Sequence, residues 1–144
     1  MKLLERWLGR RRAAEPAHVK RGREGELAAY RHLRKLGYTV VARNYRPRDR
    51  SGEIDLVAWD GPTLAFIEVK TRSSEDFGSP ESAVDGEKRR RLIRAAGDYL
   101  RRARLDPGCA RFDVVSVIWG PAVEIRLEKD AFAMRETAKF GRLY

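Results

Sequence analysis

The chain has 144 residues, 42% of them hydrophobic, which is enough for one domain with a single core. A lone cysteine, Cys109, excludes a disulfide framework and a cysteine-based zinc site. No run approaches the roughly 18 apolar residues of a membrane span, and the basic N-terminus lacks the apolar segment of a secretion signal. We therefore expect a reducing, cytoplasmic setting.

The net charge of +10 is concentrated in two blocks. Residues 1–23 hold eight Lys or Arg against two acids, and residues 86–104 also hold eight against two, which leaves −2 for the rest of the chain. Two basic blocks around a slightly acidic centre are typical of a protein that binds a polyanion.

Residues 1–19 are predicted to form a flexible basic arm, because Pro16 interrupts the short apolar pattern before it. Within the arm, Arg10, Arg11 and Arg12 are candidates for binding phosphates. An extension without a role is the alternative.

Residues 22–36 have the three-residue apolar spacing of a helix that ends at Gly37. Glu26 lies on its inward stripe, where a carboxylate is costly unless it is paired. A first-turn acid that complements the helix dipole is the alternative interpretation of Glu26.

A strand is predicted over residues 38–45, followed by a polar loop over residues 46–51 and then a hairpin. Residues 53–59 and 64–70 both alternate with period two, and Asp60-Gly61-Pro62-Thr63 between them suits a two-residue type II′ turn. The alternation assigns Ile54 to the same face as Leu56 and Ala58.

The hairpin register places Asp55 opposite Glu68 and Glu53 opposite Lys70, with Cβ atoms about 4.5–5.5 Å apart. Two opposed carboxylates repel each other unless a cation lies between them, and Mg²⁺ is typically held by one or two carboxylates. Ion pairs from Lys70 to Glu53 and Glu68 on a solvated sheet face are the alternative.

Residues 72–85 form a longer loop that is well placed to cover this acidic pair. Residues 86–104 are predicted as a second helix in which Lys88 lies in line with the buried stripe. Strands follow at residues 111–119, where Asp113 is interpreted as an edge polar residue, and at residues 122–127.

The order of elements predicts an α/β sandwich with a mixed central sheet flanked by helices. We divide the chain into the arm at 1–19, the domain at 20–127 and a C-terminal helix or tail at 128–144.

Three ordered motifs carry a resemblance to a known family. They are Gly22-Arg23-Glu24-Gly25-Glu26, Gly52-Glu53-Ile54-Asp55-Leu56 and Glu68-Val69-Lys70-Thr71-Arg72. Together they resemble the YraN-like family of the PD-(D/E)xK nuclease superfamily, which has the restriction-endonuclease-like fold and is similar to Holliday-junction resolvases. The resemblance covers about residues 20–119. Ile54 replaces the proline of the superfamily motif.

The resemblance implies a nuclease site that uses Mg²⁺ or Mn²⁺. Asp55, Glu68 and the Val69 carbonyl would hold the metal, and Lys70 would orient the attacking water. Glu26 would complete the metal shell, with Glu24 as the fallback for that role. Nucleic-acid contacts are expected from the basic side chains that follow the motif or lie on the second helix and the arm, namely Arg72, Lys88, Arg89, Arg90, Arg94, Arg10, Arg11 and Arg12.

The expected function is metal-dependent hydrolysis of branched, flapped or single-stranded DNA in recombination, repair or processing, with a homodimer and a helicase as candidate partners. Two alternatives remain at this point. One is a nucleic-acid-binding module with little or no catalysis that acts with such a partner. The other is a basic RNA- or ribosome-associated protein that would bind RNA without needing a divalent metal.

Overall fold

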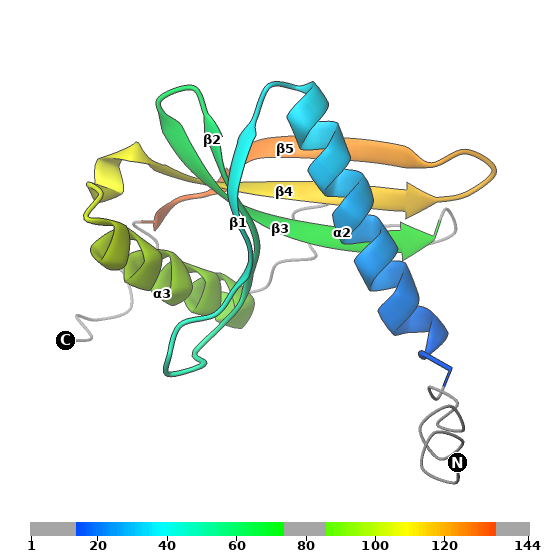
Figure 1. Cartoon of the computed structure of the whole chain (residues 1–144), viewed down its shortest axis with the longest axis horizontal. Coiled ribbons are helices and arrows are strands. Elements are labelled where there is room, and N and C mark those ends of the chain that lie inside the picture. Colours follow the sequence, from blue (N-terminus) through cyan, green and yellow to red (C-terminus); the bar gives the residue numbers. More distant parts are fainter. Residues whose placement is uncertain (1–13, 74–85, 135–144) are drawn as a thin grey trace, which may run out of the picture.

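The computed structural model describes residues 14–73 and 86–134, which form a five-stranded sheet with two long helices packed against it (Figure 1). Arg10, Arg11 and Arg12 of the predicted arm and most of the predicted 72–85 loop lie outside the described residues. In chain order the elements are α2 (Ala17–Lys35), β1 (Thr39–Tyr45), β2 (Ile54–Asp60), β3 (Thr63–Ser73), α3 (Gly86–Ala103), the 3-10 turn η2 (Pro107–Cys109), β4 (Ala110–Trp119) and β5 (Glu124–Phe132).

The sheet is mixed, and its strands lie side by side in chain order. Strands β1, β2 and β3 are antiparallel, β4 runs parallel to β3, and β5 returns antiparallel to β4. A parallel pair needs a long crossover connection, and α3 lies in the one that joins β3 to β4. The predicted α/β fold with a mixed sheet is therefore confirmed.

The central hairpin has the predicted register. Asp60 pairs with Thr63, and the ladder continues to Leu56 opposite Ile67. Gly61 has a φ of 57°, which a glycine adopts without strain, and Pro62 supplies the fixed negative φ that a type II′ turn needs next. The same local chemistry that makes the turn therefore sets which residues of β2 and β3 face each other.

Two apolar clusters cover opposite faces of the sheet. Val57, Leu64 and Phe66 pack with α3, whereas the alternate residues of the same strands pack with Ala29 and Leu33 of α2. This alternation places one helix on each face (Figure 1). Because the central strands are buried on both faces, apolar residues occupy most of their positions.

Several predicted boundaries were wrong by a few residues. Helix α2 begins at Ala17, before the expected residue 22, because Pro16 precedes the first turn, where proline is tolerated. Strand β3 continues to Ser73 because it pairs with β4 as far as Trp119. Strand β5 continues to Phe132, into the region expected to be a helix or tail, because the Phe132 ring stacks on Phe112 with centroids 4.6 Å apart.

Two predicted side-chain positions were also wrong. Ile54 packs in the α3 cluster with Val57, not with Leu56 and Ala58, so the alternation of β2 breaks at Asp55. Asp113 is not an edge residue, since it is 1% exposed and lies in the interior strand β4.

Asp113 is held in a polar network at the hairpin end of the sheet. Arg111 donates to both of its carboxylate oxygens, at 2.7 and 2.9 Å, and also to Asp60 Oδ2 at 2.8 Å. The backbone N–H of Asp130 donates to Asp113 Oδ1 at 3.0 Å. Because its oxygens are satisfied within the protein, we interpret this carboxylate as structural.

Candidate active site

A cleft of about 590 Å³ opens between the start of α3, the loop that joins β1 to β2, and the adjoining parts of β2 and β3. Carboxylates of both hairpin strands reach it, and cationic side chains come from the loop and from α3. Its lining residues are Arg46, Arg50, Gly52, Glu53, Asp55, Glu68, Glu87, Lys88, Arg91 and Leu92. The acidic pair predicted from the sequence therefore lies in a cleft with cations around it.

The backbone of the hairpin opens at Asp55. The regular strand pairing ends at Leu56 opposite Ile67. Two residues beyond Ile67, the N–H of Val69 donates to the side-chain oxygen Oδ2 of Asp55 at 2.8 Å. A side-chain carboxylate thus takes the place of a strand carbonyl. In an extended strand the N–H and C=O of one residue project toward the same neighbouring strand, so the Val69 carbonyl is directed to the Asp55 side.

The ionised form of Asp55 is disfavoured in this environment. Glu68 is 6% exposed, and Asp55 is half-buried beside it. Burial and the charge of Glu68 raise the pKa of Asp55 to about 8, although the hydrogen bond from Val69 opposes the shift. A nearby cation would favour the charged form of Asp55 and would relieve its repulsion by Glu68.

Two lysines approach the pair from different elements. Lys70 Nζ, from β3, lies 3.7 Å from Glu68 Oε1, and Lys88 Nζ, from the first turn of α3, forms an ion pair with the same oxygen. Burial and the neighbouring Lys88 lower the pKa of Lys70. Burial alone would lower the pKa of Lys88 as well, but its hydrogen bond with Glu68 and the nearby carboxylate charges outweigh burial and raise it.

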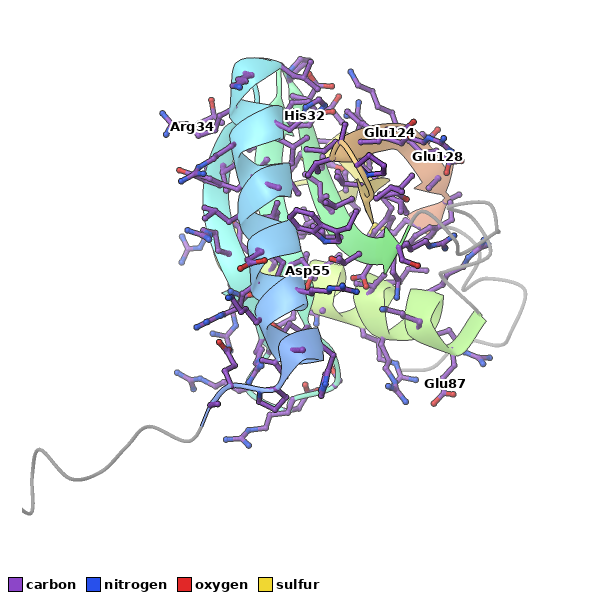
Figure 2. All side chains as sticks on the ribbon, turned by 90° about the vertical axis from the view of Figure 1, so that its right-hand side faces the viewer. His32, Arg34, Asp55, Glu87, Glu124 and Glu128 are labelled. Atoms are coloured by element: carbon purple, nitrogen blue, oxygen red, sulfur yellow. The ribbon has the colours of Figure 1, made fainter. Side chains whose placement is uncertain are left out.

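Glu26, on α2, is coupled to this site through its charge. Burial and the charges of Glu53 and Glu68 raise its pKa, while Arg43 opposes the shift. In the view of Figure 2, Asp55 is labelled beside the ribbon of α2, and the charge of Glu26 in turn contributes to the raised pKa of Asp55. The structure therefore brings Glu26 into electrostatic contact with the carboxylate pair.

A glycine explains how α2 comes close enough for this contact. Gly25, next to Glu26, is buried, and a Cβ at this position would lie 2.2 Å from Thr71 Oγ1 of β3. Only a residue without a side chain lets the helix approach the strand here. The exposed Glu24 forms a surface ion pair with Lys20 at 3.8 Å.

A second motif glycine positions the opposite wall. A Cβ on Gly52 would lie 2.8 Å from the Arg91 carbonyl of α3, so the loop before β2 packs directly on that helix. Glu53, which the sequence placed opposite Lys70, instead pairs with Arg46 across 3.0 Å. The alternative of a Glu53–Lys70 ion pair is thus replaced by one within the loop.

The donor set fits a hard divalent cation that keeps most of its water. Asp55, Glu68 and the Val69 carbonyl supply oxygen donors, as Mg²⁺ or Mn²⁺ requires. Within residues 14–73 and 86–134, no three His, Cys, Asp or Glu side chains converge into a metal-binding group. Glu26 therefore does not join the other two carboxylates as a third close ligand in this structure.

The basic residues predicted to contact nucleic acid have different surroundings. Lys88 lies in the cleft, whereas the Arg89 guanidinium lies over the Phe132 ring, 5.3 Å from its centroid. Arg90 and Arg94 are exposed on α3, and Arg72 is half-buried near the end of β3.

Sequence reasoning missed three cleft arginines and one buried hydroxyl. Arg46 and Arg50 precede the GEIDL motif and Arg91 faces Gly52, so the polar loop before the motif was the available signal for the first two. Ser116 is the register partner of Lys70 on β4; it is 2% exposed, and its Oγ has no hydrogen-bond partner among the described residues.

Comparison with known proteins places the chain among similar sequences. The model of a family described as "Uncharacterised protein family UPF0102" matches residues 25–117. A UPF0102 protein of Solibacter usitatus is 61% identical over 111 residues, which cover 77% of this chain and 84% of the relative. UPF0102 proteins of Koribacter versatilis and Symbiobacterium thermophilum are 47% and 49% identical, covering 83% and 77% of this chain and 84% and 94% of theirs.

Proposed function

This chain belongs to the UPF0102 family, and we propose that it is a metal-dependent nuclease that hydrolyses phosphodiester bonds of DNA. The observation that carries the proposal is the Asp55–Glu68 pair, in which burial and the charge of Glu68 raise the pKa of Asp55 to about 8 in the absence of a metal. Sheet stability gains nothing from such a pair. A site that must hold a divalent cation accounts for it.

In the proposed reaction, Asp55, Glu68 and the Val69 carbonyl would hold Mg²⁺ or Mn²⁺. A divalent ion bound there would supply a charge that polarises the scissile phosphate and lowers the pKa of a water molecule. The chain's own groups then orient the reactants: Lys70 directs the attacking water or stabilises charge on the phosphate. Glu26 acts from α2 through its charge or through an intervening water, which makes it a positioning residue. Hydrolysis at phosphorus is in line, without a covalent intermediate.

The resemblance to the PD-(D/E)xK nucleases supports the same assignment. The motif residues Asp55, Glu68 and Lys70 are all present, and they occupy one face of a hairpin, with the crossover helix α3 beside it. The motif glycines Gly25 and Gly52 hold α2 and α3 close to that hairpin. The two glycines therefore have a structural role, which is to bring both helices close to the hairpin that carries the proposed site.

The basic residues in and around the cleft support a nucleic acid as the substrate. Arg46, Arg50, Lys88 and Arg91 line the cleft and are balanced there by Glu53, Asp55, Glu68 and Glu87, so a bound divalent cation would leave an excess of positive charge for a phosphate backbone. We propose branched, flapped or single-stranded DNA as the substrate class, in recombination, repair or processing in the cytoplasm. A homodimer and a helicase partner belong to the same proposal. No helix within the described ranges is long and apolar enough to cross a membrane.

A second candidate function is a nucleic-acid-binding module with little or no catalysis. It is favoured by the Lys88–Glu68 ion pair, because a side-chain cation already neutralises one of the two carboxylates. This candidate predicts binding of DNA that does not depend on a divalent metal.

One experiment separates the two candidates. The full-length protein is incubated with labelled duplex, flap, junction and single-stranded DNA, in Mn²⁺, in Mg²⁺ and in EDTA. The nuclease proposal predicts cleavage of at least one substrate with metal and none in EDTA. Binding in EDTA without cleavage in either metal would favour the binding module, and the same panel in RNA tests the RNA-associated alternative.

A further inference from the structure

The position of Lys88 points to a role beyond that of a surface phosphate contact. Lys88 projects from the first turn of α3 and forms its ion pair with Glu68 Oε1 of β3, so its side chain bridges two walls of the cleft. The Lys88 side chain is 36% exposed, compared with 7% for Glu68. The Lys88 ammonium group therefore pairs with a carboxylate oxygen of Glu68, the residue that we propose as a metal ligand.

Two other cations that line the cleft pair with different carboxylates. Arg46 pairs with Glu53 at 3.0 Å, and Arg91 pairs with Glu87 at 2.6 Å. These partners lie toward the rim, where Glu87 points away from the body of the molecule in Figure 2. Lys88 is thus the helix-borne cation that competes directly for a proposed metal ligand.

The charges of the site show what must change when a metal binds. With both carboxylates ionised, Asp55 and Glu68 balance Lys70 and Lys88, and a divalent cation would bring the same group to a net charge of +2. A cation that enters next to two ammonium groups is repelled by both. Either Lys88 leaves Glu68 or an anion enters, and the phosphodiester of the substrate supplies that anion.

We propose that Lys88 couples metal binding to phosphodiester binding. In the metal-free protein Lys88 neutralises Glu68, and when the metal takes Glu68 the ammonium group transfers to a phosphate oxygen of the substrate. The inference rests on the nuclease function proposed above. Lysine suits this exchange because its compact charge has three donors on a flexible four-carbon stem, which can move from one oxygen to another.

The coupling is reciprocal by thermodynamic linkage. If phosphate withdraws Lys88 from Glu68 and so tightens metal binding, then metal tightens phosphate binding by the same factor. Lys70 does not provide the same exchange, because it sits on the sheet itself, 3.7 Å from Glu68 with its side chain 24% exposed.

The test compares full-length wild type with Lys88→Met, which keeps the length of the side chain and removes its charge. The control is Lys35→Met, at the exposed C-terminal end of α2. Mn²⁺ affinity without nucleic acid is measured by calorimetry and by electron paramagnetic resonance of free Mn²⁺. Cleavage of a substrate from the panel is then measured at saturating Mn²⁺. Thermal melting checks folding, and Lys88→Gln replaces Lys88→Met if that variant does not fold.

We expect Lys88→Met to bind Mn²⁺ about tenfold more tightly than wild type, which corresponds to about 1.4 kcal/mol, and to cleave at least about a hundredfold more slowly. Lys35→Met should match wild type in both measurements, and Lys88→Arg, which keeps the charge, should stay closer to wild type than Lys88→Met does.

Unchanged or weaker Mn²⁺ binding by Lys88→Met would overturn the competition with the metal. Tighter binding with wild-type cleavage would overturn the transfer to phosphate. In both cases cleavage by the wild type would leave the nuclease proposal standing. If wild type and every variant fail to bind Mn²⁺, the metal centre itself is wrong, and the coupling falls with it.

Discussion

Replacing Asp55 by asparagine should stabilise the metal-free protein by an amount that grows with pH. In the folded protein the pKa of Asp55 is raised from 3.8 to about 8, mainly by burial and by the charge of Glu68. Between these two values the folded state holds a proton that the unfolded state has released. Wild-type stability therefore falls as pH rises from about 4 to about 8, and it is greatest at the acidic end of that window.

The size of the effect between pH 5 and 7 does not depend on the exact pKa of the folded state. As long as the pKa lies well above 7, one extra proton is bound throughout this interval, and the free energy of unfolding falls by about 1.4 kcal/mol per pH unit. Asp55→Asn has no such proton, and its amide oxygen can still accept from the Val69 N–H. Its stability relative to wild type should therefore increase by about 2.7 kcal/mol from pH 5 to pH 7.

The assay is urea unfolding of both proteins in EDTA at half-unit intervals of pH, with each stability taken relative to wild type. Asp49→Asn is the control, because Asp49 is exposed and its hydrogen bond with Ser51 lowers its pKa. Its difference from wild type should be constant over pH 5–7, since both states are already ionised there. An Asp55→Asn difference as flat as that of the control would refute the buried, repelling carboxylate pair.

Three further predictions test the surroundings of the site. Gly25→Ala should lower the free energy of unfolding in urea by about 1–3 kcal/mol, because the added Cβ meets Thr71 of β3. Gly22→Ala on the same helix, where a Cβ would meet nothing within 4 Å, should be neutral or slightly stabilising. Equal effects of the two substitutions would contradict the close approach of α2 to β3. Asp113→Ala should cost about 1–3 kcal/mol, because it leaves the Asp130 N–H and part of the Arg111 guanidinium without an acceptor, while Asp60 still pairs with Arg111. A loss well below about 1 kcal/mol would show that the network is dispensable. Mn²⁺ at ten- to a hundredfold above its Kd should raise the stability of wild type by about 1.4–2.7 kcal/mol and that of Asp55→Asn by much less; equal stabilisation would place the metal elsewhere.

The hairpin could be predicted from sequence because its determinants are local. Gly61 and Pro62 specify the turn, and period-two alternation specifies the strands, so the register from Asp60–Thr63 to Leu56–Ile67 followed directly. The facing of Asp55 and Glu68 is a continuation of that register. The alternation predicted the wrong face for Ile54, because this residue packs with Val57 in the α3 cluster.

The walls of the cleft could not be predicted in the same way, because they depend on contacts between distant segments. Arg91 lines the cleft because α3 packs on Gly52, thirty-nine residues earlier in the chain. The extension of β5 to Phe132 likewise depends on a ring stack with Phe112 across the sheet. In each case the residue has no distinctive local pattern, and the partner that determines its position is distant in sequence.

The measurement that tests the central claim most directly is single-turnover cleavage, alongside DNA affinity in EDTA, for wild type, Glu68→Gln and Lys70→Met. The nuclease account predicts that wild type cleaves with Mn²⁺ and that both variants lose cleavage by at least about a hundredfold. DNA affinity in EDTA should stay equal or rise in Glu68→Gln, which removes an acid facing phosphate, and should fall modestly in Lys70→Met, which removes a cation. Cleavage at the wild-type rate by both variants would contradict the account.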